Sequence, residues 1–211
     1  DQIRADLRRS VEAFRDAQAP ARPNKANYTA ACILMSRVSL YMEEYEDAIA
    51  YADSAIAWGR HSILDINGLK AGDSFTYESS PETVFTMGGY IMNQIHQPDS
   101  AGRFGYKTSF LCWKYRETSG RIGYYLLFRL PEAYLNKAEA QAILGDESGA
   151  KQTLNVLREK RFTVGSMPTI ESEMAANGEN LVDFVRGERR RELCYEGHRW
   201  FDLRRYAVNT K

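Results

Sequence analysis

Two helix–turn–helix patterns, far apart in the sequence, constrain the fold of this chain more than any other feature. In the first, apolar or small residues recur at helical spacing over residues 29–43 and again over residues 46–58. In the second, Pro131 suits the first position of a helix. Gly145 can then end that helix, and Asp146 can cap the next one. Both patterns predict a pair of antiparallel helices joined by a short turn.

The two hairpins also resemble each other. When they are superposed, Ala48 falls on Ala150, about three periods of 34 residues further along the chain. Small residues at such positions let paired helices approach closely, as they do in tetratricopeptide-type repeats. No repeat is recognisable between the two hairpins. We therefore expect a mainly α fold built on tetratricopeptide-like hairpins.

Further helices are predicted at both ends of the chain. Residues 1–17 place four apolar side chains on one helical face, and prolines in residues 18–24 break that helix. The four are Ile3, Leu7, Val11 and Phe14. Near the other end, Asn180 can cap a last helix, which Gly197 is expected to end.

The segment between the hairpins has a different character. Residues 62–128 hold most of the turn signals, and β-like runs stand at 83–87 and 124–128. Aromatic residues are concentrated in the same segment. We expect an irregular, partly β, aromatic-rich insertion here.

Composition and motifs exclude several functions. The 28 basic residues are balanced by 28 acidic ones, which argues against a surface built to attract nucleic acid. Cys32, Cys112 and Cys194 form no CxxC or Cys/His cluster, so we expect no zinc site and no cofactor. No apolar run reaches the length of about 18 residues that spans a membrane. Nucleophile-elbow, P-loop and dinucleotide motifs are missing, so we expect no enzyme activity.

Among the histidines, His198 stands four residues before Asp202, a spacing that a metal site can use. Because further ligands at suitable spacing are missing, we expect His198 to be packed and hydrogen-bonded in the core.

An arginine-rich segment, RGERRRELCYEGHRWFDLRRY at residues 186–206, holds seven arginines and four acidic residues. It could bind nucleic acid, hold an acidic ligand or stabilise the fold. The inward stripe of the preceding helix, continued at helical spacing, reaches Glu188 and Glu192, where apolar residues belong. Buried carboxylates need pairing, and arginine is their best partner. We therefore expect a partly buried ion-pair network that docks the last helix, made of Glu188, Arg189, Arg190, Arg191, Glu192 and Arg199.

Three segments resemble one family. ERRRELCYEGHRWFDLRRY is similar to the C-terminal signature of the SusD/RagB family of nutrient-uptake proteins. FRLPEAYLNKAEAQAILGD and SRVSLYMEEYEDAIAYADSAI resemble the late and early helical-repeat segments of that family. The resemblance implies a SusD-like fold, in which tetratricopeptide-like hairpins form a right-handed superhelical scaffold. It also implies a surface-exposed outer-membrane lipoprotein of Bacteroidetes that binds oligo- or polysaccharide.

The same resemblance implies a partner and a domain organisation. The partner is a SusC-like TonB-dependent transporter of the outer membrane, on which family members sit as a lid. The chain is expected to be a single SusD-like domain, 1–211, truncated at its N-terminus. Membrane association is expected through a lipidated N-terminus that is absent from this chain. Its helical scaffold covers 1–60 and 129–206, and the irregular candidate ligand-binding region covers 62–128.

Composition alone points to a candidate glycan site in residues 90–121. Sugars need aromatic platforms against their C–H faces and polar partners at their edges. The candidate platforms are Tyr90, Phe104, Tyr106, Trp113 and Tyr115, and the candidate polar partners are Asn93, Gln94 and Arg103. The alternative is that these aromatic residues pack the segment onto the helices.

Two functions remain open at this point. The first is a glycan-binding protein of a surface uptake complex. The second is a helical-repeat interaction scaffold without a glycan site of its own. Exposed aromatics clustered beside a pocket in 90–121 would favour the first, and an apolar patch on the helices would favour the second.

Overall fold

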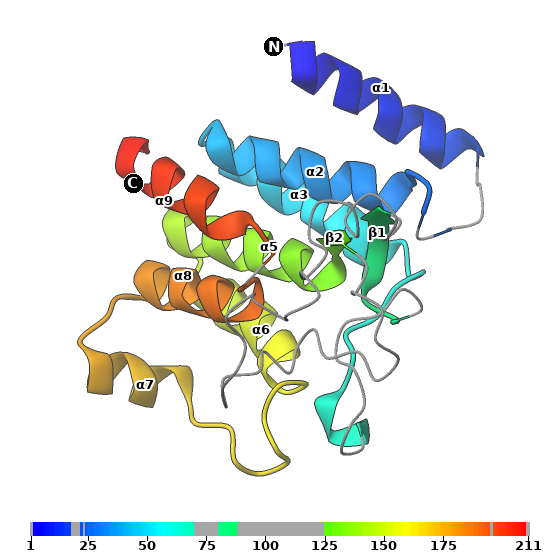
Figure 1. Ribbon diagram of the computed structural model, residues 1–211. Helices are drawn as coiled ribbons and strands as arrows, with labels where there is room; N and C mark the ends of the chain where they lie inside the picture. Colours follow the sequence, from blue (N-terminus) through cyan, green and yellow to red (C-terminus); the bar gives the residue numbers. More distant parts are fainter. Residues whose placement is uncertain are drawn as a thin grey trace, which may run out of the picture.

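The computed structural model describes residues 2–17, 22, 24–69, 80–87, 125–194 and 196–209. Most of them belong to helices (Figure 1). The elements in chain order are α1 (Gln2–Ala17), α2 (Tyr28–Tyr41), α3 (Tyr45–Ala57), the 3-10 helix η1 (Ile66–Gly68), β1 (Thr83–Met87), β2 (Tyr125–Arg129), α5 (Leu130–Leu144), α6 (Glu147–Arg158), α7 (Ile170–Asn177), α8 (Leu181–Glu192) and α9 (His198–Val208).

Two antiparallel hairpins form the centre of the molecule. Helix α2 packs on α3, α3 on α5, and α5 on α6, so the predicted hairpins lie side by side (Figure 1). Alanines with no exposed surface, among them Ala48, Ala52 and Ala138, line these helices and let their backbones approach closely. Helix α8 packs on the remaining side of α5. The mainly α, tetratricopeptide-like fold is confirmed.

Side-chain caps fix where the helices begin. The carboxylate of Asp146 accepts a 2.9 Å bond from the amide of Gly149, and Asn180 caps α8 in the same way. Both caps were predicted. Gly145 ends α5 with φ at 84°, a left-handed conformation in which a side chain would be strained.

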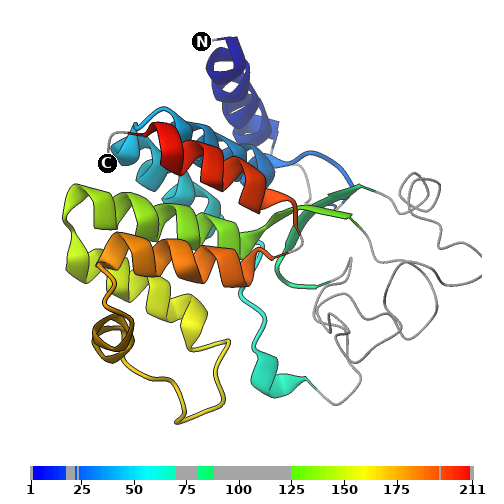
Figure 2. The ribbon, with the colours of Figure 1, turned by 60° about the vertical axis from the view of Figure 1, so that its left-hand side comes forward.

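A two-stranded antiparallel sheet closes one end of the helical layer. Strand β1 pairs with β2, with Thr83 opposite Arg129 and Phe85 opposite Phe128. These strands fall where the β-like runs were predicted, within one residue. They bracket residues 88–124, and Met87 lies opposite Tyr125 at the end of the sheet that points away from α5 (Figure 2).

One expectation about the C-terminal part of the chain is wrong. Gly197 does not end the last helix: α8 ends at Glu192, and Gly197, with φ at 80°, precedes a further helix, α9. On α1, Val11 is buried and Ile3 is 67% exposed. Helix α1 packs mainly on α2, at the outside of the helical layer (Figure 2).

A buried arginine connects three segments of the chain. Arg129 is 2% exposed, and its guanidinium lies 2.7 Å from Glu82, 2.9 Å from Glu192 and 2.7 Å from Glu196. Arg161, after α6, pairs with two of the same carboxylates, Glu82 at 2.5 Å and Glu192 at 2.9 Å. These pairs join β1, β2 and the ends of α6 and α8.

A second buried group of ion pairs holds α8 and α9 on α5. Glu139 on α5 accepts hydrogen bonds of 2.9 and 2.8 Å from Arg205 and one of 2.9 Å from Arg186. Arg189 on α8 donates to Asp202 on α9 at 2.9 and 3.0 Å. Helix α8 also packs apolar side chains in the core, whereas the buried positions of α9 are the charged residues Asp202 and Arg205.

The structure divides the six residues of the predicted network into three groups. Arg189 and Glu192 take part in the buried pairs, but their partners come mostly from outside that segment. Glu188 and Arg191 pair with each other at the surface. Arg190 and Arg199 are exposed and form no ion pair with any described residue.

Replacing Glu139 by Ala should lower the free energy of unfolding by about 3–5 kcal/mol, because it leaves two guanidiniums without their buried carboxylate. Urea unfolding would measure the loss. The matched control is Glu188→Ala, whose partner is exposed, with an expected loss under about 1 kcal/mol. Equal losses for the two variants would contradict this assignment.

Acid should also weaken the fold. Burial alone would raise the pKa of Glu132, but the charges of Arg37, His198 and Arg189 and the hydrogen bonds from Arg37 together outweigh it and lower that pKa to about 2. The stabilisation from this carboxylate is therefore present above about pH 4.5 and lost as the pH falls toward 2. Between these values, the free energy of unfolding should fall less steeply in Glu132→Gln than in the wild type. Parallel curves would show that Glu132 titrates normally.

Candidate functional site

The predicted glycan-binding residues lie outside the part of the chain that the structure describes. They are Tyr90, Asn93, Gln94, Arg103, Phe104, Tyr106, Trp113 and Tyr115. They stay a prediction. Of their setting, the structure describes the strand pair that brackets them and the helices beside it.

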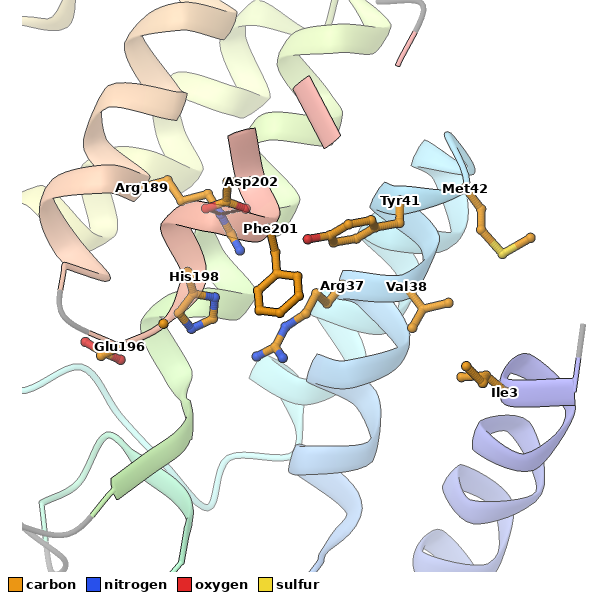
Figure 3. Close-up of a pocket in the computed structure, with 11 residues that line it drawn as sticks. Ile3, Arg37, Val38, Tyr41, Met42, Arg189, Glu196, His198, Phe201 and Asp202 are labelled. Atoms are coloured by element: carbon orange, nitrogen blue, oxygen red, sulfur yellow. Dashed lines mark hydrogen bonds and ion pairs between the residues drawn. The ribbon is translucent and has the colours of Figure 1, made fainter. Parts of the chain in front are cut away.

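A pocket of about 570 Å³ lies among the described helices. It opens between the first turn of α1, the second half of α2 and the start of α9 (Figure 3). This volume falls in the range of small-ligand sites and of pockets that accept a partner's side chain. Its walls are mainly apolar, formed by Ile3, Val38, Tyr41, Met42 and Phe201.

Charged groups form the floor of this pocket, and each is already engaged. Arg37 donates to both carboxylate oxygens of Glu132, at 2.5 and 2.7 Å, and lies 4.8 Å from the ring of Phe128. Asp202 is held by Arg189. Because these charged groups are paired with one another, the pocket suits an apolar group and offers no reactive side chain on its floor.

His198 lies at the edge of the same pocket, where its ring points toward Arg37 (Figure 3). Burial lowers the pKa of the imidazole, Arg189 and Arg37 lower it further, and Glu132 partly opposes them. The ring is therefore neutral at pH 7. It was expected to be hydrogen-bonded, but it makes no hydrogen bond with any described residue.

The described residues hold no group of three or more His, Cys, Asp and Glu side chains that could bind a metal ion. His198 and Asp202 do not form a metal pair, because Arg189 occupies the carboxylate.

The cysteines differ in their exposure. Cys32 is a fully buried free thiol whose pKa burial raises to about 11, so it stays protonated. Cys194 is half-buried and forms no disulfide with a described residue, and Cys112 lies outside the described residues.

The arginine-rich segment also contains Trp200 and Phe201, at positions where the sequence pattern favours packing. In the structure, Trp200 is 68% exposed and Phe201 56% exposed. On α9 the inward positions belong to Asp202 and Arg205. A helical wheel places Asp202 and Arg205 on one face, but the usual rule that apolar residues face inward would turn that charged face toward solvent.

Among the described residues, no helix is both long and apolar enough to cross a membrane.

The His198 ring should titrate below pH 6.5, and replacing Arg37 by Gln should raise its pKa because a repelling positive charge is removed. Proton NMR of the imidazole would measure both values, with the resonance assigned through a His198→Gln variant. Lys25→Gln, which removes an exposed positive charge elsewhere, is the control and should leave the titration unchanged. An unchanged pKa in Arg37→Gln would contradict this arrangement of charges.

The comparison with known proteins agrees with this fold. Residues 19–211 match the model of the SusD family. A segment of 82 residues is 38% identical to SusD-like protein P38 of Formosa agariphila, over 37% of this chain and 16% of that protein.

Solved structures extend the similarity to nearly the whole chain. A SusD superfamily protein from Bacteroides thetaiotaomicron superposes with a TM-score of 0.69 at 20% identity, covering 96% of this chain and 54% of that one. A SusD-like carbohydrate binding protein from Bacteroides vulgatus gives 0.64 at 18% identity, over 96% and 50%. A putative sugar binding protein from the same species gives 0.63 at 25% identity, over 97% and 52%.

The chain thus spans about half the length of these solved structures, and a smaller share of the curated relative. The family match nevertheless covers both helical hairpins and the buried charge pairs that hold α8 and α9. The chain belongs to the SusD family.

Proposed function

We propose that the chain is a glycan-binding, non-catalytic protein of a cell-surface nutrient uptake complex. The observation that carries the proposal is the family match over residues 19–211. Two of the solved structures with this fold are described as carbohydrate or sugar binding proteins. The ligand class that follows is an oligo- or polysaccharide.

Residues 90–121 supply the glycan contacts in this proposal. The segment offers aromatic platforms and amide or guanidinium partners, which suit the two faces of a sugar. The strand pair supports this placement, because it holds the flanking residues Met87 and Tyr125 opposite each other on a sheet whose other end joins α5. Loops held by a rigid scaffold are common binding sites.

The partner in this proposal is a SusC-like TonB-dependent transporter in the outer membrane of a Bacteroidetes cell. The chain captures the glycan at the cell surface and delivers it to that transporter. Family membership supports this role, and the curated relative comes from Formosa agariphila.

The alternative function is a helical-repeat interaction scaffold that has no glycan site of its own. The exposed Trp200 and Phe201 beside the pocket favour protein binding on the helical layer. The two functions are compatible, because a lid on a transporter must also bind protein.

Affinity electrophoresis against a panel of plant, host and microbial polysaccharides tests the glycan proposal. Retardation by one class should be weakened at least several-fold in Trp113→Ala and Tyr106→Ala, because each removes a platform for the sugar face. Trp200→Ala is the matched control, since it removes an aromatic side chain from α9 and should leave retardation unchanged.

Circular dichroism of each variant would separate lost binding from lost folding. Retardation that is unchanged in both platform variants would remove these residues from the site. No retardation by any polysaccharide class would favour the scaffold function instead.

A further inference from the structure

Helix α9 turns an apolar face outward. On its exposed side, Trp200 and Leu203 are three residues apart, while Phe201 turns toward α2 and Val208, seven residues further on, lies on the same side as Phe201. Large apolar side chains are usually buried, and a continuous group of exposed ones marks an interaction surface. The opposite side of α9 cannot take them, because buried charge pairs occupy it.

The apolar surface continues from α9 across the pocket. Phe201 of α9 and Ile3 of α1 form two of its walls, and Val38 and Tyr41 of α2 line the pocket between them (Figure 3). Met42 and Tyr41 between them are also partly exposed. We call this continuous area, made by the outward side of α9, the pocket and the first turn of α1, the α9 patch.

The charges on the α9 patch are positive on the α9 side. Arg199 and Arg204 flank Trp200 and Leu203, and neither forms an ion pair with a described residue. The acidic residue of α9, Asp202, is buried and bound by Arg189. The first turn of α9 has no side-chain cap and no acidic residue, so its amide dipoles add to the positive field.

The acidic residues on the α1 side of the patch are paired. Arg4 lies 2.7 Å from Glu44 and 3.6 Å from Asp47, so these carboxylates are neutralised by α1 itself. The exposed charge that remains around the pocket is therefore positive, and it attracts carboxylates.

We propose that the α9 patch docks a partner protein segment that places an apolar side chain in the pocket and carboxylates against Arg199 and Arg204. A pocket of about 570 Å³ with mainly apolar walls suits an aromatic or aliphatic anchor side chain. The flanking arginines would fix the position of the bound segment and raise its association rate. The proposal rests on the proposed function, because it assigns the surface on which the transporter would bind.

A sugar fits this pocket less well. Sugar sites need several polar groups aimed at hydroxyls, whereas the charged groups on this floor are engaged with one another. His198 and Tyr41 are the polar side chains left at the edge, and both can serve the backbone of a bound peptide.

The test uses two labelled synthetic peptides of the same length and the same Leu- and Phe-rich helical face. Glu residues flank this face in one peptide and Lys residues flank it in the other. Fluorescence anisotropy with the intact chain should show the Glu peptide binding at least tenfold more tightly than the Lys peptide. Arg199→Glu combined with Arg204→Glu should reverse this preference. Failure of both peptides to bind would overturn the proposal.

Three variants test the apolar part. Trp200→Ser combined with Phe201→Ser should weaken the binding of the Glu peptide at least tenfold. Val38→Trp should do the same by filling the pocket, and it leaves the exposed apolar side chains of α9 in place. The matched control is Val164→Ser, at a position 86% exposed and outside the patch, and it should leave binding unchanged.

The same variants in the polysaccharide panel separate the two proposals. If these variants are still retarded by the polysaccharide but no longer bind the Glu peptide, docking and glycan binding use different surfaces, as proposed. If Phe201→Ser loses glycan retardation, the pocket belongs to the glycan site and the docking proposal is wrong. Self-association that the Trp200→Ser and Phe201→Ser changes abolish, without peptide binding, would assign the patch to a second copy of this chain.

Discussion

The arrangement of the C-terminal half depends on buried guanidinium–carboxylate pairs. Arg129 at the end of β2 holds carboxylates from three other places in the chain, Glu82, Glu192 and Glu196. A buried charge without its partner is strongly destabilising, so few other arrangements of these segments are accessible. The pairs also set the position of the strand pair, and with it the two ends of the candidate glycan-binding segment.

Local signals made the hairpins, their caps and both strands predictable. Asp146 and Asn180 cap helices through atoms three residues away, so a short stretch of sequence contains the whole interaction. The partners of Glu192 could not be found in this way. Arg129 and Arg161 lie far from it in the sequence, and helical spacing shows which side chains point inward but not what they meet.

The helix α9 and the pocket were missed for a related reason. Pattern reading assumes that apolar residues face inward, and α9 reverses this rule, with Asp202 and Arg205 inside and Trp200 outside. The pocket needs three helices that are distant in sequence, so no single segment indicates it. The candidate glycan residues came from composition alone, which selects a residue type but not a geometry.

In helix α9, the side chains that hold the helix on the fold differ from those that are exposed for binding. A helix held by its apolar face would have none left for a partner. Because Arg205 with Glu139, and Arg189 with Asp202, hold α9 in place, its apolar side chains remain at the surface. Such pairs stabilise less than apolar packing of the same volume would, since each ion must leave water. This difference is the energetic cost of keeping Trp200 and Phe201 exposed, and an exposed apolar surface of this kind is consistent with a binding role.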